Sequence, residues 1–197
     1  MTPLRFVWGF IALALASSSQ AQPPAVSLVA ETNHSTVQFS VPISKGITRI
    51  TGKFNSYTIA LTIPDGDLTR ASIKAVIQAA SINTGDAGRD EDLKTEDFFD
   101  AAKYPEIVFT SERIEKTTDG YVATGPLQLH GVTKTIQLPF TITERRDETT
   151  IGFRCRTSLR RSDYGVGTTF KHTTDDNFIA DDIGIEIDFW TKRAKRN

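Results

Sequence analysis

Apolar and polar residues alternate with a period of two over most of this chain, and no other sequence feature restricts its fold as much. Val37, Phe39 and Val41 alternate with polar neighbours, and the same pattern returns in later segments. Because successive side chains of a strand point to opposite faces, this pattern is typical of strands with one buried face. It predicts about eight antiparallel strands, within residues 37–41, 50–63, 73–79, 107–111, 121–129, 136–142, 151–159 and 183–189.

Two interruptions of the pattern predict local irregularities. The alternation changes phase at Asn55–Ser56, which predicts a β-bulge within one strand. From about residue 89 to residue 105, acidic residues surround Leu93, Phe98 and Phe99 at spacings that fit no strand. We expect a short helical excursion there.

Eight antiparallel strands with one excursion fit two architectures, a sandwich and a closed barrel, and the period alone does not choose between them. The inward positions mix aromatic residues with small ones, which are Gly52, Ala75, Ala79, Ala123 and Gly125. The small residues either let large side chains fit opposite them or line a hollow interior, since a barrel of this size permits both. Both interpretations of the interior stay open at this point.

The amino terminus predicts export. A basic residue precedes the apolar run Phe6–Ala16, and small residues follow at Ser19 and Ala21. This is the pattern of a secretory signal peptide, residues 1–21, which leaves one mature domain, residues 22–197, in the periplasm or outside the cell. The alternative is a membrane anchor, but a membrane span requires about 20 apolar residues, more than this run supplies.

The composition and the motifs exclude several classes of function. Lys and Arg number 23 against 24 Asp and Glu, so no net basic field exists for nucleic acid. Cys155 is the one cysteine, which excludes an internal disulfide, and its inward position predicts an inert buried thiol. His34, His130 and His172 form no HxH or HxxxH pair, so we expect no metal site and predict that they bind backbone or cap strand ends. Because no GxSxG elbow or placed acid–base pair occurs, we predict no enzyme and no catalytic residue.

Two groups of basic residues leave a choice between a solvated surface and a membrane contact. They lie near the end of one strand and in the carboxyl-terminal tail, and they are Arg154, Arg156, Arg160 and Arg161, and Lys192, Arg193, Lys195 and Arg196. Anionic lipid headgroups attract each such residue by about 1 kcal/mol, which predicts transient contact with a membrane. The alternative is an outer strand face and a chain end that water solvates.

Several motifs occur in a fixed order along the chain. The most specific run begins with Ser-Ile-Asn-Thr at residue 81, passes through Arg-Asp-Glu-Asp-Leu-Lys and Asp-Phe-Phe-Asp, and ends with Lys-Tyr-Pro at residue 105. Further motifs are His34-Ser35, the glycine-to-lysine run 125–134, and Arg-Ser-Asp-Tyr-Gly at 161–165. This order of motifs resembles the YceI-like family of bacterial polyisoprenoid-binding proteins, from about residue 34 to residue 189.

The resemblance implies an all-β fold, an extended eight-stranded lipocalin-like antiparallel β-barrel whose pore holds a long isoprenoid chain. It implies an isoprenoid quinone or a prenyl phosphate as ligand, for transport, storage or sequestration, and no cofactor besides that lipid. The alternatives are an accessory that holds a quinone for a membrane electron-transfer protein, and a hydrolase or isomerase that uses His130. The chain departs from the family at Pro42, where a histidine often follows the first strand. The headgroup contact of that position is therefore open.

The inward positions and the resemblance together give a set of expected site residues. We expect the cavity to be lined by Phe39, Val41, Phe54, Ile77, Ala79, Phe98, Phe99, Phe109, Gly125, Leu127, Leu129, Phe153, Ile185 and Phe189. Arg89, Asp90 and Asp163 are expected at a polar rim, near a headgroup. The alternative is that these three residues, with Arg161, pair with one another or with turn backbone and hold the barrel mouth shut. The excursion is then either a lid or a fixed cap over one end.

Overall fold

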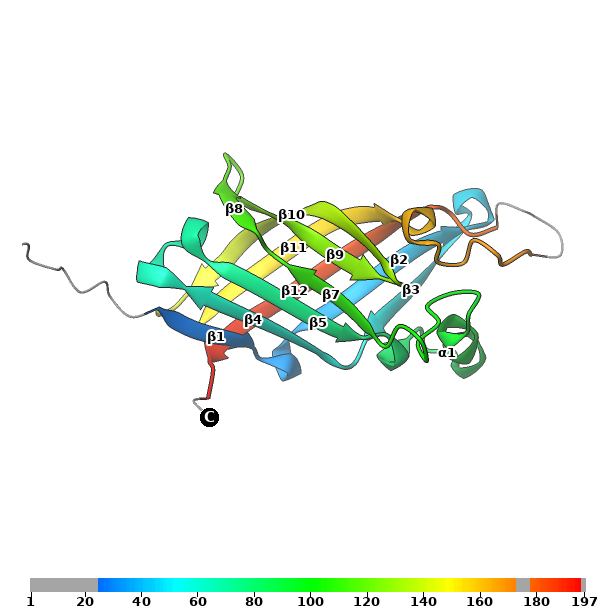
Figure 1. Ribbon diagram of the computed structural model, residues 1–197, viewed down its shortest axis with the longest axis horizontal. Coiled ribbons are helices and arrows are strands. Elements are labelled where there is room, and N and C mark those ends of the chain that lie inside the picture. Colours follow the sequence, from blue (N-terminus) through cyan, green and yellow to red (C-terminus); the bar gives the residue numbers. More distant parts are fainter. Residues whose placement is uncertain (1–24, 173–177, 196–197) are drawn as a thin grey trace, which may run out of the picture.

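The structure is a computed structural model that describes residues 25–172 and 178–195. It is an elongated barrel of antiparallel strands, with the α-helix and several turns gathered at one end (Figure 1). The expected signal peptide, residues 1–21, lies outside the described residues. No helix in the described ranges is long and apolar enough to cross a membrane.

Within those ranges, twelve strands, one α-helix and six turns of 3-10 helix make up the secondary structure. The strands are β1 (Val26–Ala30), β2 (Thr36–Ile43), β3 (Thr48–Phe54), β4 (Tyr57–Ile63), β5 (Ser72–Gln78), β6 (Ile82–Asn83), β7 (Glu106–Thr110), β8 (Arg113–Lys116), β9 (Tyr121–Leu129), β10 (Val132–Arg145), β11 (Ile151–Arg160) and β12 (Asp182–Arg193). The helix is α1 (Ala87–Lys94), and the 3-10 turns are η1 (Thr32–His34), η2 (Ser44–Gly46), η3 (Pro64–Gly66), η4 (Leu68–Arg70), η5 (Ala79–Ser81) and η6 (Arg161–Tyr164).

In the described part of the chain, the twelve strands form a closed barrel of eight, because four barrel strands are each interrupted once. β1 and β2 make up the first, β3 and β4 the second, β5 and β6 the third, and β7 and β8 the fourth. The order continues through β9, β10, β11 and β12. Since β12 pairs with β11 on one side and with β1 and β2 on the other, the sheet closes on itself. The predicted barrel is confirmed, and the sandwich is excluded.

The expected strands agree with the structure except at β1, β6 and β8, which the alternation does not indicate. β6 has two residues and β8 has four, too few for a period to be recognised, and β1 precedes the first expected strand. The predicted irregularity at Asn55–Ser56 is the junction between β3 and β4. There the Asn55 N–H donates to the Ser81 carbonyl at 3.0 Å, so neighbouring barrel strands are interrupted at the same level.

The most deeply buried group of side chains lies at one end of the barrel, which we call the closed end. Its members are at most 3% exposed, and they are Leu28, Leu61, Ile63, Leu68, Ile114, Ala123 and Ile151. Partly buried apolar side chains such as Tyr121 and Ile142 pack against them. The hydroxyl of Thr191, buried among the same strand ends, donates to the Thr149 carbonyl at 2.7 Å and accepts the Ile151 N–H at 3.1 Å. These bonds satisfy the Thr191 hydroxyl, so its burial at the closed end leaves no unpaired polar group at this residue.

A ladder of aromatic rings crosses the interior from β9 to β12. The ring centroids of Tyr121 and Phe140 are 5.4 Å apart, those of Phe140 and Phe153 are 6.0 Å apart, and those of Phe153 and Phe189 are 5.0 Å apart. Such pairs add attraction beyond the area that they bury. Cys155 lies opposite Phe140 in the sheet, and burial raises the pKa of its thiol to about 11. The thiol is therefore inward and buried, as predicted.

Gly125 lies on the inward side of β9, but it does not border open space. A Cβ atom at this position would lie 2.0 Å from the Thr110 carbonyl oxygen and 3.0 Å from Cα of Ser111. The glycine therefore permits β9 and the chain after β7 to approach each other closely. The expectation that Gly125 lines a cavity is corrected, because backbone occupies the place of its side chain.

Replacing Gly125 by alanine is expected to lower the free energy of unfolding by about 2 kcal/mol or more, because the new methyl group and the Thr110 carbonyl cannot both keep their places. Urea unfolding followed by circular dichroism measures this change. Gly88→Ala is the matched control, since the nearest atom to its Cβ position is 3.5 Å away and alanine favours a helix by about 1 kcal/mol. Equal stability of the two variants would contradict the close approach.

Candidate functional site

The opposite end of the barrel, which we call the mouth, is where β2, β9 and β11 end and where β3, β10 and β12 begin. Two chain segments cover it. The first covering segment, residues 84–104, includes α1, and the second, residues 161–170, begins with η6. Figure 1 shows both segments at the same end of the molecule.

The first covering segment is a capped helix followed by a tight turn. Asp86 Oδ1 accepts the Arg89 N–H at 3.0 Å, and this bond lowers the pKa of the Asp86 carboxyl. Asp86 is thus the residue that caps the helix. After the helix, the Asp100 N–H returns to the Thr95 carbonyl at 2.8 Å. The predicted helical excursion is confirmed, and it begins at Ala87.

Aromatic contacts connect the first covering segment to the barrel interior. The Phe99 ring meets the Phe54 ring edge-on with centroids 5.9 Å apart, and Phe54 lies 5.8 Å from Phe39. A Cβ at Gly52 would lie 2.4 Å from the Phe39 ring, so this glycine makes room for a large neighbour. At this position, the interpretation in which small residues let large ones fit is confirmed.

The second covering segment is held in shape by Arg161. Its guanidinium donates to four backbone carbonyls, those of Val166 at 3.0 Å, Gly167 at 2.8 Å, Ile179 at 3.1 Å and Ala180 at 3.0 Å. The planar fork of donors suits such a convergent set of acceptors. Arg161 therefore ties the chain before β12 to the chain that crosses the mouth.

The two covering segments are joined to each other. The Gly167 N–H donates to the Asp97 carbonyl at 2.9 Å, and the Thr169 hydroxyl donates to the Asp97 carboxylate at 2.6 Å. The Phe98 and Phe170 rings lie 5.3 Å apart. Between a free lid and a fixed cap, these contacts favour the cap.

His130 supports the second covering segment from the turn between β9 and β10. Its backbone has a φ of 50°, followed by Gly131 at 74°, which makes this turn tight. His130 Nδ1 lies 2.9 Å from the Tyr164 carbonyl oxygen, and the Tyr104 ring packs edge-on against its ring at 5.2 Å. The predicted bond from this histidine to backbone is confirmed.

The other histidines make aromatic contacts. His34 lies 4.9 Å from the Trp190 ring, and the His172 ring stacks on Phe178 at 3.9 Å. In the described residues, no three His, Cys, Asp or Glu side chains gather in a group that could hold a metal ion.

The expected polar rim residues bind their neighbours. Asp90 Oδ1 accepts the N–H and the hydroxyl of Thr84, both at 2.7 Å, and Arg89 reaches the same hydroxyl at 3.4 Å. Asp163 pairs with Lys134 at 2.8 Å. These contacts fit the alternative in which the polar groups hold the mouth together, and a headgroup contact remains a prediction.

Most of the expected lining residues lie among the inward side chains. Phe98 departs from this arrangement, because its ring packs against Gly167 and Phe170 in the second covering segment. Ala79 is 1% exposed, at the start of η5. Those that are buried in the core or packed against it are Phe39, Phe54, Ile77, Phe99, Phe109, Leu127, Leu129, Phe153 and Phe189, and the sheet register places Val41 and Ile185 on the same inward face.

Several inward side chains between the closed end and the mouth are only half-buried. Thr157 and Ile185 lie opposite each other in the sheet, and Ile185 lies opposite Phe39. Close packing on all sides would shield a side chain more completely. The inward residues of β10 to β12 in this half are therefore not fully enclosed by protein, and they are Ile136, Leu138, Thr157, Leu159, Ile183, Ile185 and Ile187.

Thr157, Leu159 and Ile183 were not among the expected site residues, although the period of two places all three inward. Tyr164 was not expected either, because it follows the last inward position of β11 and lies in no strand. Burial of Tyr164 to 2% exposure comes from the path of the second covering segment.

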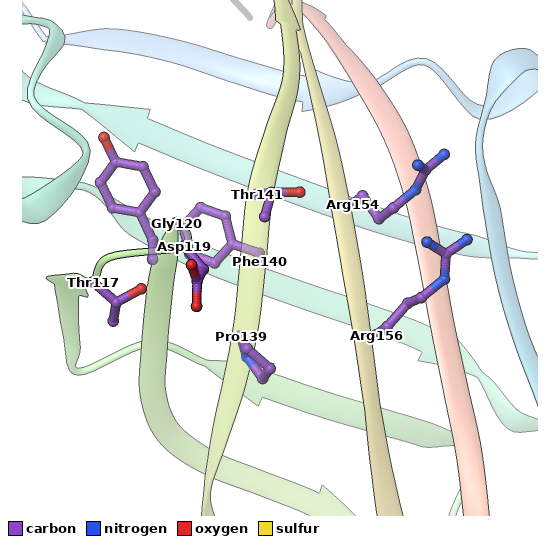
Figure 2. Close-up of a pocket in the computed structure, with 9 residues that line it drawn as sticks. Thr117, Asp119, Gly120, Pro139, Phe140, Thr141, Arg154 and Arg156 are labelled. Atoms are coloured by element: carbon purple, nitrogen blue, oxygen red, sulfur yellow. The ribbon is translucent and has the colours of Figure 1, made fainter.

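The outer face carries compensated charge. A depression of about 270 Å³ lies over β10 and β11 beside the turn after β8, with Arg154 and Arg156 on its border (Figure 2). Ion pairs join the outward arginines of β11 to acidic residues in or next to β12, and these pairs are Arg154–Asp188, Arg156–Glu186 and Arg160–Asp181. In the basic tail, Lys192 pairs with Glu31, and Arg196 lies outside the described residues. Membrane contact through these groups remains a prediction.

Pro42 lies in β2 opposite Arg49 without ending the strand. Its carbonyl accepts the Ala180 N–H at 3.0 Å. Because the nitrogen and the carbonyl of a strand residue face the same neighbour, the missing N–H of Pro42 is turned away from β3. The proline therefore costs no hydrogen bond to β3.

Arg161→Lys is expected to loosen the second covering segment, because one ammonium group cannot replace a fork that serves four carbonyls. We expect a loss of about 2 kcal/mol in the free energy of unfolding, with faster hydrogen exchange at the Val166 and Gly167 amides. Arg160→Lys is the matched control, since Arg160 is exposed and makes one ion pair. Unchanged exchange in Arg161→Lys would show that the guanidinium does not hold the segment.

Comparison with known sequences gives a consistent family. A profile of the YceI-like domain matches residues 28–190. The UPF0312 protein YE1254 of Yersinia enterocolitica is 27% identical over 142 residues, which cover 70% of this chain and 73% of that protein. A UPF0312 protein of Yersinia pestis is 28% identical over 142 residues, which also cover 70% of this chain and 73% of that protein.

Solved structures share the barrel. BcnA of Burkholderia cenocepacia superposes with a TM-score of 0.73 at 23% identity, covering 82% of this chain and 98% of BcnA. The YCEI protein of Campylobacter jejuni superposes with a TM-score of 0.65 at 30% identity, covering 76% of this chain and 88% of that protein. A polyisoprenoid binding domain from Saccharophagus degradans superposes with a TM-score of 0.66 at 18% identity, covering 86% of this chain and 99% of that domain. With a matching profile over most of its length and the closed eight-stranded barrel, this chain belongs to the YceI-like domain family.

Proposed function

We propose that this protein binds a long-chain isoprenoid lipid inside its barrel, and that it transports, stores or sequesters this lipid without chemical change. The observation that carries the proposal is the set of inward apolar side chains that remain half-buried between the closed end and the mouth, such as Leu159 and Ile185. An interior of this kind fits a slender apolar chain. The name of the Saccharophagus degradans neighbour, a polyisoprenoid binding domain, supports the same ligand class.

The energetics favour such a ligand. Burial contributes about 0.8 kcal/mol for each CH₂ group. Moving an isoprenoid of tens of carbons from water into the barrel is therefore strongly favourable before the cost of ordering the chain is subtracted. Ordering a flexible chain offsets much of that gain, and measured affinities do not exceed about −21 kcal/mol. Affinity is therefore easily reached, and selectivity depends on the chain length and on the head of the lipid.

We propose that the lipid enters at the mouth. Among the described residues, the large apolar side chains with the greatest exposure are Ile47 at 85%, Phe170 at 38% and Val132 at 36%. Ile47 follows η2, Phe170 ends the second covering segment, and Val132 begins β10, so all three lie on turns at the mouth. Exposed apolar groups gathered in one region favour contact with a lipid source. The proposed export from the cytoplasm rests on residues 1–21, which are outside the described ranges.

Mass spectrometry of an organic extract of the purified protein tests the ligand class. We expect one prenyl lipid at near-stoichiometric amount, because the barrel offers a long apolar interior. A protein that yields no lipid, and takes up neither a prenyl quinone nor a prenyl phosphate offered in detergent, would contradict the proposal.

Thr157→Phe is expected to reduce the bound lipid at least about tenfold, because a ring at this inward, half-buried position fills space that the lipid needs. Ser158→Phe is the matched control, since the neighbouring side chain is exposed on the outer face. Lipid occupancy by mass spectrometry and folding by circular dichroism are measured for both. If Thr157→Phe stays folded and fully occupied, the lipid does not lie along β11.

A further inference from the structure

One buried hydroxyl inside the barrel lacks a partner. In the described residues, the buried side-chain polar atoms without a hydrogen bond are the Tyr164 hydroxyl and Thr124 Oγ1. Thr124 lies on the outward side of β9, since its sheet partners Arg113 and Gln137 are both exposed. Tyr164 is 2% exposed and belongs to the same buried cluster as the inward strand residues. A hydroxyl in such surroundings loses its bonds to water, and the loss is offset only if another group supplies a partner.

Contacts at the mouth fix the position of Tyr164. His130 Nδ1 lies 2.9 Å from its carbonyl oxygen, and the Val166 N–H closes the turn onto the Arg161 carbonyl at 3.1 Å. The Lys134 ammonium lies 5.9 Å from the centroid of the phenol ring. The hydroxyl is therefore a donor held in place before any ligand binds, which is the arrangement that binding sites use for their few polar contacts.

The surroundings of the Tyr164 hydroxyl favour a neutral acceptor. The phenol is a neutral donor, and burial and the nearby Asp163 carboxylate raise its pKa. A ring carbonyl can accept its hydrogen bond without adding charge to the interior. A phosphate would place a second anion near the Asp163 carboxylate and would bury a charge, which is far more costly than burying a carbonyl.

On the basis of the proposed function, we propose that the Tyr164 hydroxyl donates a hydrogen bond to a carbonyl oxygen of the bound lipid, and that the protein thereby selects isoprenoid quinones over prenyl hydrocarbons and prenyl phosphates. The quinone ring lies beneath the second covering segment. The prenyl tail extends toward the closed end along the half-buried positions of β10 to β12.

Tyr164→Phe tests this role, because it removes the hydroxyl and keeps the ring. The probes are a prenylated benzoquinone, the prenylbenzene of equal chain length, and the corresponding prenyl diphosphate, each titrated into the purified protein. We expect the variant to bind the quinone about tenfold more weakly and the hydrocarbon within about twofold of the unmodified protein. In the infrared spectrum, the carbonyl band of the bound quinone is expected at lower frequency in the unmodified protein and to lose this shift in the variant.

Tyr104→Phe is the matched control, because Tyr104 packs on His130 at the mouth and Lys103 lies over its ring. It is expected to bind all three probes as the unmodified protein does. Failure of the unmodified protein to bind any probe would overturn the proposed function itself. Binding with unchanged quinone affinity and carbonyl band in Tyr164→Phe would overturn this inference alone. Equal losses for quinone and hydrocarbon, or a diphosphate bound as tightly as the quinone, would overturn it as well.

Discussion

The closure of the barrel at β12 is the constraint on which the rest of the structure depends. β12 pairs with β11 along one edge and with β1 and β2 along the other, so all inward side chains share one interior. Closure also removes free strand edges, which otherwise invite association with other chains. Once the sheet is closed, only its two ends can admit a molecule. The differences between those ends then decide what the protein can hold.

The two ends are built by different interactions. At the closed end, deeply buried apolar side chains pack together, and Thr191 is paired with backbone. At the mouth, the cover depends on polar contacts of single residues, above all the four carbonyl bonds of Arg161 and the bonds that join Asp97 to Gly167 and Thr169. Apolar packing distributes its stabilisation over many contacts, whereas the cover at the mouth depends on a few directional bonds of single residues.

The sequence allows prediction of those features that depend on neighbours in the chain. The period of two locates most strands and the inward Cys155, and the loss of period near residues 89–105 locates the excursion. Other features arise from contacts between distant segments. The backbone of Thr110 occupies the place that a side chain at position 125 would need, and Arg161 binds carbonyls up to 19 residues away. The half-buried state of Leu159 also depends on side chains of other strands, and for this reason the accessible part of the interior could not be predicted.

A tube that is plugged at one end gives a linear guest a fixed direction. If the lipid binds as proposed, deeply buried side chains at the closed end, such as Leu28, Ile63 and Ile151, would stop a prenyl tail that enters at the mouth. The distance from these side chains to Tyr164 would then set the number of isoprene units that fit between them. A longer lipid would keep its head beyond the reach of the phenol, and a shorter one would leave unfilled volume behind its tail. Residues that only pack the far end of the barrel would in this way set the length of the lipid that the mouth retains.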